Sequence, residues 1–277
     1  MEKDMFSTKK DRLPKLLIFI FLFIAVVYLN GCKNSPPATT QSKNPPQPGF
    51  DLANSDAKAI EIADKVMEAC GGWKNWENTR YITWRALGKR LNVWDKWTGD
   101  IRIESRRSLI LMNLHTMKGH AWKGLQEITD AEALKRAMEY GYEAWLHDSY
   151  WLFLPFKLKD AGVTLKYIGE GKTDDDRPVD ILALTFKNVG QNPRNKYIIY
   201  VEKASHLLTQ WAYFMDASDK YPRFTTPWAN YQKYGNILLS DDRGEKKHKD
   251  IAVFNKLPRS VFEAPVPIDW EKITNDQ

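Results

Sequence analysis

The chain has 277 residues, of which 43% are hydrophobic and 13% aromatic, and its formal net charge is +6. This is enough apolar material for a buried core, in one large domain or two small ones. The positive charge is mild and evenly spread. It gives no support to nucleic-acid binding and supports at most a weak attraction to anionic membrane surfaces.

The first 31 residues have the pattern of a secretory signal peptide. Four basic residues between positions 9 and 15 precede an uncharged apolar run over residues 16–29. A basic start, a short apolar segment and a small residue before the processing site are typical of such signals. The apolar run has about 14 residues, whereas a membrane-spanning helix needs about 20.

The end of this leader resembles a lipobox, the recognition site of lipoprotein signal peptidase. Leu29 stands three residues before Cys32, and Gly31 stands directly before it. The resemblance implies that residues 1–31 are removed and that Cys32 receives a diacylglycerol thioether. Two acyl chains would hold the exported protein at a membrane, and we expect the outer membrane, facing the periplasm. The alternative is an uncleaved anchor helix with an incidental cysteine, which also leaves the domain outside the cytoplasm.

A Pro-rich polar tether is expected over residues 32–49, followed by the folded domain over residues 50–277. The tether segment holds five prolines and no large apolar side chain. Such a segment is flexible and partly extended, because nothing in it gains from burial.

The domain is expected to begin with a helix over residues 55–70. Ser55 or Asn54 can cap its start, and Gly71-Gly72 ends it. Its apolar stripe includes Cys70, which favours a buried and inert thiol at that position.

A second helix is predicted over residues 129–148, inserted in the middle of the strands. It begins with a capping-box sequence. Gly141 weakens it and permits a bend or a break. The most apolar stretch outside the leader, residues 150–158, follows this helix.

The other elements are predicted as about ten or eleven strands. Aromatic and β-branched runs separated by short polar turns indicate antiparallel pairing, so we expect an α+β domain with a large curled antiparallel sheet. The expected strands cover residues 81–87, 90–97, 100–106, 109–116, 163–168, 179–188, 196–203, 207–214, 228–235, 237–240 and 251–254.

No motif carries the chemistry of an enzyme. The sequence has no nucleophile elbow, no paired-histidine zinc helix and no phosphate-binding glycine loop. His115 and His120 are close together but lack a third ligand. The acidic run 174–176 lacks the spacing of a calcium loop and is predicted as a hairpin tip. We therefore expect no catalytic residue, no metal and no cofactor.

Several predicted strands carry large apolar side chains on both faces. Tyr197, Ile199 and Val201 point one way along their strand, and Ile198 and Tyr200 point the other way. A sheet with one face in water alternates apolar and polar residues, so this pattern indicates cover on both faces or one face lining an apolar cavity. A plain core and a lipid-binding groove both fit it.

Over roughly residues 55–265 the chain resembles the outer-membrane lipoprotein-sorting family, the LolA/LolB-like carriers, and in detail a lipid-anchored branch of it. The resemblance implies a half-open antiparallel β-barrel closed by helices, with acyl chains held on its concave side. The stretches that carry it are Gly72-Trp73-Lys74-Asn75-Trp76 with Tyr81-Ile82-Thr83-Trp84, Leu154-Pro155-Phe156-Lys157-Leu158, Asn195-Lys196-Tyr197-Ile198-Ile199-Tyr200-Val201, Trp228-Ala229-Asn230-Tyr231 with Tyr234-Gly235, and Leu257-Pro258-Arg259-Ser260-Val261-Phe262.

The first functional hypothesis is that the domain binds a membrane lipid or the acyl chain of a lipoprotein, such as palmitate, with the inserted helix as a lid. The second is a structural or partner-binding envelope lipoprotein with a filled core and no ligand. A hydrolase with a dispersed site has the least support. Under the first hypothesis the expected acyl-chain or lid contacts are Trp84, Trp145, Trp151, Phe153, Phe156, Tyr200, Trp211 and Tyr213.

Overall fold

The computed structural model describes residues 43–173, 175–187 and 193–275. The chain divides into two compact units, Met1–Thr40 and Gln41–Gln277, and all described residues belong to the second. The predicted leader, Cys32 and the tether up to residue 42 therefore lie outside the described residues. The second unit has three hydrophobic cores of its own, which is what a domain needs to fold independently.

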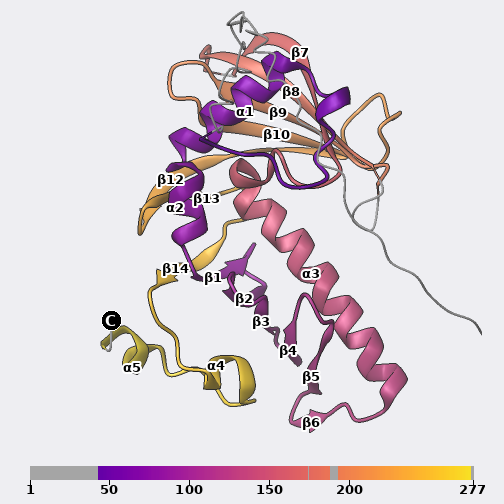
Figure 1. Ribbon diagram of the computed structural model, residues 1–277, viewed down its shortest axis with the longest axis vertical. Helices are drawn as coiled ribbons and strands as arrows, with labels where there is room; N and C mark the ends of the chain where they lie inside the picture. Colours follow the sequence, from indigo (N-terminus) through magenta and orange to yellow (C-terminus); the bar gives the residue numbers. More distant parts are fainter. Residues whose placement is uncertain (1–42, 174, 188–192, 276–277) are drawn as a thin grey trace, which may run out of the picture. The chain divides into compact units, whose positions relative to one another are not determined.

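The α+β prediction is confirmed: the described strands form antiparallel sheets, none of which closes on itself (Figure 1). Two large sheets and one hairpin are present, where one large sheet was expected. The seven-stranded sheet has the order β14-β1-β2-β3-β4-β5-β6, with β1 Tyr81–Ala86, β2 Arg90–Asp95, β3 Asp100–Glu104, β4 Ser108–Asn113, β5 Lys118–Lys123, β6 Gln126–Glu127 and β14 Lys249–Phe254. The five-stranded sheet has the order β11-β10-β9-β8-β7, with β7 Val163–Lys172, β8 Pro178–Phe186, β9 Lys196–Glu202, β10 Leu208–Phe214 and β11 Phe224–Pro227. The hairpin pairs β12 Ala229–Tyr234 with β13 Ile237–Asp242.

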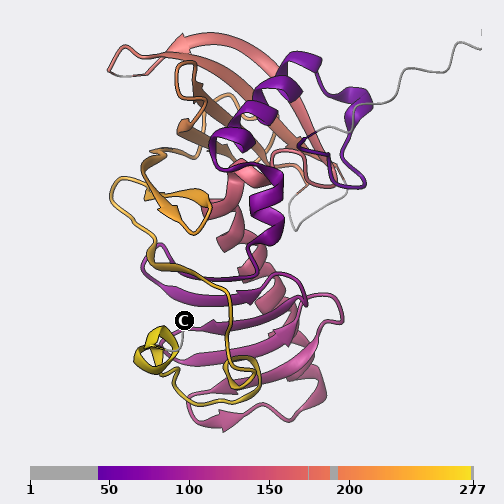
Figure 2. The ribbon, with the colours of Figure 1, turned by 60° about the vertical axis from the view of Figure 1, so that its left-hand side comes forward.

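The helices lie on both faces of the seven-stranded sheet and over the five-stranded sheet. In Figures 1 and 2, α3 runs along one face of the seven-stranded sheet, the C-terminal helices lie on its other side, and α1 lies over the five-stranded sheet. The described helices are η1 Leu52–Asn54, α1 Ala57–Ala69, α2 Gly72–Asn78, α3 Ala131–Lys157, α4 Ser260–Glu263 and α5 Trp270–Asn275. None of the helices in this part of the chain has the length and apolarity needed to cross a membrane.

The polar residues before α1 bind the neighbouring strand instead of capping the helix. Leu165 N donates to Ser55 Oγ at 3.0 Å, and Tyr167 N donates to the Asp56 carboxylate at 2.9 Å. The helix has no side-chain cap, so the predicted cap at Ser55 or Asn54 is wrong. These hydrogen bonds fasten the start of α1 to β7, the edge of the five-stranded sheet.

The double glycine ends α1, as predicted, and it also begins α2, which the sequence analysis missed. Gly71 has φ of 115°, and a Cβ there would lie 2.5 Å from the carbonyl oxygen of Asn236 in the β12–β13 turn. Leu238 N also donates to the Cys70 carbonyl at 2.9 Å. Only glycine allows the backbone to approach the hairpin this closely, so Gly71 sets the direction in which α2 leaves.

The second predicted helix, α3, is longer than expected and unbroken. Its cap is Asp130, which accepts a hydrogen bond from Ala133 N at 2.8 Å. The helix does not break at Gly141, where a Cβ would lie 2.7 Å from Met112 Sδ and 3.2 Å from Ile110 Cγ2. Glycine at this position lets the helix approach β4 closely, and the helix continues through the apolar stretch to Lys157.

Pro155 lies inside α3 and leaves one backbone acceptor without its helical partner. Proline has no N–H, so the Trp151 carbonyl four residues earlier receives no helical hydrogen bond. Arg243 Nη2 donates to this carbonyl at 2.7 Å, and His248 Nε2 donates to it at 3.0 Å. Two buried side chains from the loop after β13 thereby hold the end of α3 in place.

The C-terminal part of α3 separates two hydrophobic cores. Phe153 packs with Trp76 and Trp84 against the seven-stranded sheet, and the next residue, Leu154, packs with Trp211 against the five-stranded sheet. Cys70 is fully buried in the first core, which raises the pKa of its thiol to about 12. The prediction that the Cys70 thiol is buried is therefore confirmed.

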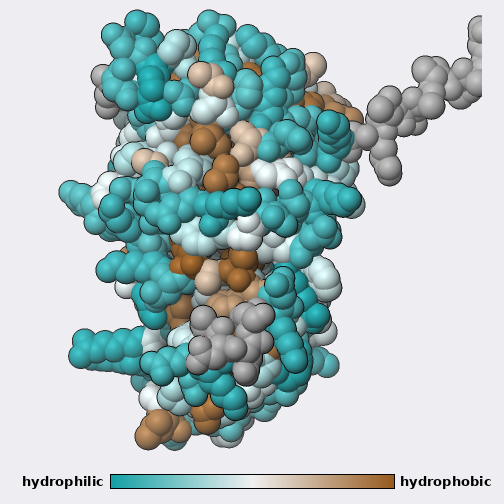
Figure 3. Space-filling model, turned by 90° about the vertical axis from the view of Figure 1, so that its left-hand side faces the viewer, coloured by the Kyte–Doolittle hydropathy of each residue, from teal (hydrophilic) through white to brown (hydrophobic). Residues whose placement is uncertain are grey.

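A third core lies on the outer face of the seven-stranded sheet, under α4 and α5. Buried Arg102 donates to the carbonyls of Val261, Ala264 and Val266 at 3.1, 2.9 and 2.8 Å. The first of these carbonyls lies in the single turn of α4 and the other two lie beyond its end, so none of them has a donor within the helix. Figure 3 looks onto the side with the hairpin and the C-terminal helices, where hydrophobic residues lie in hollows between hydrophilic ridges.

The folded domain begins before residue 50, so the tether was predicted too long at its C-terminal end. Asn44 is 4% exposed. Its side chain donates to the Asp64 carbonyl and accepts from Trp73 N, both at 3.1 Å, and Lys159 Nζ binds its carbonyl. A polar residue is buried here because both side-chain groups and its carbonyl find partners, which composition alone does not reveal.

Candidate functional site

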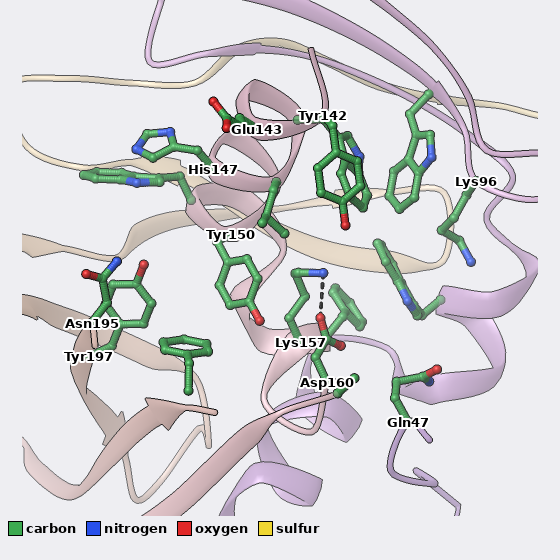
Figure 4. Close-up of a pocket in the computed structure, with 18 of the residues that line it drawn as sticks. Gln47, Lys96, Tyr142, Glu143, His147, Tyr150, Lys157, Asp160, Asn195 and Tyr197 are labelled. Carbon is green, nitrogen blue, oxygen red and sulfur yellow. Dashed lines mark ion pairs between the residues drawn. The ribbon is translucent and has the colours of Figure 1, made fainter. Parts of the chain in front are cut away.

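A cavity of about 870 Å³ lies between the two large sheets, along one side of α3 (Figure 4). Its first wall comes from α2 and the end of β2, and its second wall comes from the five-stranded sheet. The side chains of α3 line the space between them. The first wall holds Trp73, Trp76, Trp94 and Trp97, the second holds Phe186, Tyr197, Tyr213 and Phe224, and α3 provides Tyr142, Trp145, Tyr150, Trp151 and Phe156.

The aromatic rings of the cavity are held by contacts with one another. Trp76 stacks on Phe156 with 4.6 Å between ring centroids, and Trp94 meets Trp145 edge to face at 5.3 Å. On the other side, Trp151 packs edge to face on buried Trp211 at 4.7 Å. Rings fixed in this way keep the cavity open without a ligand and offer it a rigid apolar surface.

An ion pair lies in the middle of the cavity. Lys157 Nζ is 2.7 Å from Asp160 Oδ2 and 4.9 Å from the centroid of the Tyr150 ring. In Figure 4, Tyr150 lies between this pair and Tyr197. Burial, followed by the negative charge of Asp160, raises the pKa of Tyr150 well above 10, so its phenol stays protonated and uncharged at neutral pH.

A second ion pair borders the first wall. Lys96 Nζ lies 3.4 Å from Glu77 Oε1 and 4.9 Å from the centroid of Trp76. Burial lowers the pKa of Lys96. Beside it, Trp97 is 58% exposed, and its indole N–H donates to the Glu77 carbonyl at 2.9 Å. The rim of the cavity therefore combines a paired lysine with a large exposed indole.

The structure brings four of the eight predicted contact residues to the cavity: Trp145, Trp151, Phe156 and Tyr213. The other four do not line it. Trp84 and Phe153 are fully buried in the first core, and Trp211 is fully buried in the second, behind Trp151 and Tyr197. Tyr200 lies on the opposite face of β9 from Tyr197, because side chains alternate along a strand.

The first wall and the charged groups of the cavity were not predicted from the sequence. Trp73 and Trp76 were noted only as part of the family resemblance, and Trp94 only as part of a strand. The dense tryptophan content between residues 73 and 97 was the available signal. The ion pair of Lys157 with Asp160 could not be predicted without knowing where α3 ends.

Within residues 43–173, 175–187 and 193–275, no group of three or more His, Cys, Asp or Glu side chains could hold a metal ion. Nδ1 of His120, on β5, instead lies 2.7 Å from Oε1 of Glu127, on β6, at the surface.

No family model and no curated protein matches the sequence. Among solved structures, the chain is similar to a DUF1329 family protein from Desulfovibrio piger, at 14% identity over 74% of this chain and 97% of that one, with a TM-score of 0.40. It is similar to a domain from Vibrio parahaemolyticus ascribed to outer membrane lipoprotein sorting, at 13% identity over 74% and 96%, with a TM-score of 0.39. It is also similar to a LolA superfamily protein from Nitrosomonas europaea, at 13% identity over 76% and 98%, with a TM-score of 0.37.

Proposed function

We propose that this protein is a membrane-anchored extracytoplasmic lipoprotein that binds the acyl chain of a lipid or of a lipid-modified protein in its central cavity. The observation that carries the proposal is the aromatic-lined cavity of about 870 Å³ between the two sheets. A volume of about 300–1,000 Å³ is typical of ligand sites. The alternative of a filled core without a ligand is disfavoured by this volume.

The cavity suits hydrocarbon because most of its wall is aromatic and both of its lysines are paired with carboxylates. Burying one CH₂ group gains about 0.8 kcal/mol, so a 16-carbon chain gains on the order of 10 kcal/mol when fully desolvated. Part of this gain is offset by the loss of the chain's freedom. The paired Lys157 and Asp160 add no net charge that would repel an apolar chain.

The proposal also includes a lipid anchor and a location, which we infer from the sequence of the leader, residues 1–31. A lipidated Cys32 followed by a polar tether would hold the cavity near a membrane, at the outer membrane facing the periplasm. A carrier that shuttles between membranes must be free, so an anchored protein of this kind acts as a fixed receptor or local acceptor of lipid. This role requires no catalytic step.

The test is acyl-chain binding by the domain of residues 41–277. A fluorescent acyl-chain probe should bind to it and be displaced by palmitoyl lipids. Replacing cavity residue Leu146 by tryptophan should weaken binding about tenfold or more, because the added ring occupies the space of the chain. The matched control is Tyr140→Trp on the exposed part of the same helix, which should bind like the wild type. A wild-type domain that binds no probe would contradict the proposal.

A further inference from the structure

One negative charge in the lining of the cavity has no partner among the described residues. Lys157 pairs with Asp160 at 2.7 Å. Lys96 pairs with Glu77 at 3.4 Å, so both lysines of the lining already have a carboxylate. Glu143 is a further carboxylate in the lining, and no cationic side chain in the described part of the chain forms an ion pair with it. The cavity therefore offers an unpaired anion to its ligand.

Glu143 begins a row of side chains that runs along α3. It is exposed, and His147 follows it one turn later on the same face of the helix (Figure 4). The ring centroid of His147 lies 5.8 Å from that of Trp151, which lies 5.4 Å from that of Phe224 in the second wall. His147 Nδ1 is 3.2 Å from Asp148 Oδ1, so this histidine pairs with a different carboxylate. A head group beside Glu143 is thus continuous with the aromatic part of the cavity.

The aromatic rings of this cavity accept ammonium groups on their faces. Lys157 Nζ lies 4.9 Å from the ring centroid of Tyr150 and 5.9 Å from that of Trp145. Lys96 Nζ lies 4.9 Å from the ring centroid of Trp76. A cation in such a position is attracted by the negative face of the ring. A wall that suits hydrocarbon therefore also suits a positively charged head group.

Three rings of the lining have no such cation. No lysine or arginine of the described residues lies over the ring of Trp151, Tyr213 or Phe224. Proteins recognise quaternary ammonium groups with aromatic faces of this kind, and an unpaired carboxylate adds a charge attraction. An anionic head group would instead be repelled by Glu143.

We infer that the cavity prefers acyl lipids whose head group carries a positively charged nitrogen, with the Glu143 carboxylate as its counter-charge at the rim. This inference rests on the proposed function and names the class of lipid that the same site takes. The acyl chain then extends past Trp151 and Phe224 into the cavity. Free fatty acid, which brings a second carboxylate to Glu143, binds least well.

The first arm of the test compares ligands that share one chain and differ in charge. Palmitoylcholine, its uncharged analogue with a carbon atom in place of the nitrogen, and palmitic acid each displace the acyl-chain probe from the domain of residues 41–277 at about pH 8. Palmitoylcholine should bind about tenfold more tightly than the analogue, and palmitic acid should bind most weakly. Equal affinity of palmitoylcholine and the analogue, or tightest binding of the acid, would overturn the inference and leave acyl-chain binding itself intact.

The second arm removes the charge without changing the size of the side chain. Glu143→Gln should weaken the binding of palmitoylcholine about fivefold and leave the binding of the uncharged analogue unchanged. The matched control is Glu139→Gln, one turn earlier on α3, because Glu139 is also exposed but does not line the cavity. This control should bind all three ligands like the wild type.

The outcomes separate the inference from the proposed function. If Glu143→Gln keeps the full preference for palmitoylcholine, or if Glu139→Gln loses it equally, Glu143 is not the counter-charge and the inference fails alone. Failure of every palmitoyl ligand to displace or bind would remove the proposed function together with the inference.

Discussion

Acidification is expected to destabilise this domain through His248. The side chain is 2% exposed and binds through both ring nitrogens. Nε2 donates to the Trp151 carbonyl at 3.0 Å, and Leu87 N donates to Nδ1 at 3.4 Å. The ring is therefore neutral, and protonation of Nδ1 would break the second contact. Burial, followed by the positive charge of Arg243, lowers the pKa of His248 to about 3.

The size and sign of the effect follow from proton linkage. The unfolded chain binds a proton at His248 near pH 6.5, whereas the folded domain resists protonation down to about pH 3. The stabilisation is thus fully present above about pH 6.5 and is lost as the pH falls toward 3, at about 1.4 kcal/mol per pH unit. Lowering the pH from about 7 to about 5 should therefore reduce the free energy of unfolding by about 2 kcal/mol through this residue alone.

Urea unfolding of the domain at both pH values measures this loss. The control is His248→Gln, whose amide nitrogen can still donate to the Trp151 carbonyl but does not titrate. Other titrating groups act equally in both proteins, so the wild type should lose about 2 kcal/mol more than the variant between the two pH values. Equal losses in the two proteins would refute the conclusion that burial and Arg243 keep His248 neutral in the folded domain.

Three further predictions concern stability and reactivity. Asp148→Asn should lower the free energy of unfolding by about 2–3 kcal/mol in urea titrations, because the buried carboxylate binds Arg90 at 2.6 Å and the variant leaves that guanidinium without its counter-charge. Gly71→Ala should lower the free energy of unfolding by about 3 kcal/mol, because the new Cβ would lie 2.5 Å from a backbone carbonyl oxygen. Gly88→Ala is the control: this glycine also has a positive φ, but nothing lies within 4 Å of its Cβ position, so the loss should be about 1 kcal/mol. Equal losses of stability in thermal unfolding would contradict the close approach at Gly71. Cys70 should not react with thiol reagents at about pH 8 until urea unfolds the domain, because its thiol is buried and its pKa is about 12, and rapid labelling of the native protein would contradict this.

Local patterns predicted the elements better than their boundaries. The aromatic runs gave β1 to β4 and β7 to β10 close to their observed positions, because alternating large apolar residues indicate a strand. β5 was not predicted because Lys118–Lys123 has few apolar residues and no clear alternation. The segment is a strand because it pairs with β4 along its whole length. The extension of α3 past residue 148 was not predicted. It includes Pro155, for which Arg243 and His248 compensate from a distant loop that the local sequence does not reveal.

The cavity was less predictable than the fold because distant segments form it. The aromatic content indicated either a core or a groove, and the sequence did not assign each ring to one of them. Trp151 and Trp211 are neighbours in space, yet the first lines the cavity and the second is buried behind it. Which ring takes which place depends on how α3 passes between the two sheets, and that is a property of the tertiary packing.

Native mass spectrometry of the domain purified from cells tests the central claim most directly. We expect a fraction of the protein to carry one added mass that corresponds to an acyl lipid, and we expect this fraction to be lost in Leu146→Trp but not in Tyr140→Trp. A wild-type spectrum with the apo mass alone, unchanged after incubation with palmitoyl esters, would contradict it.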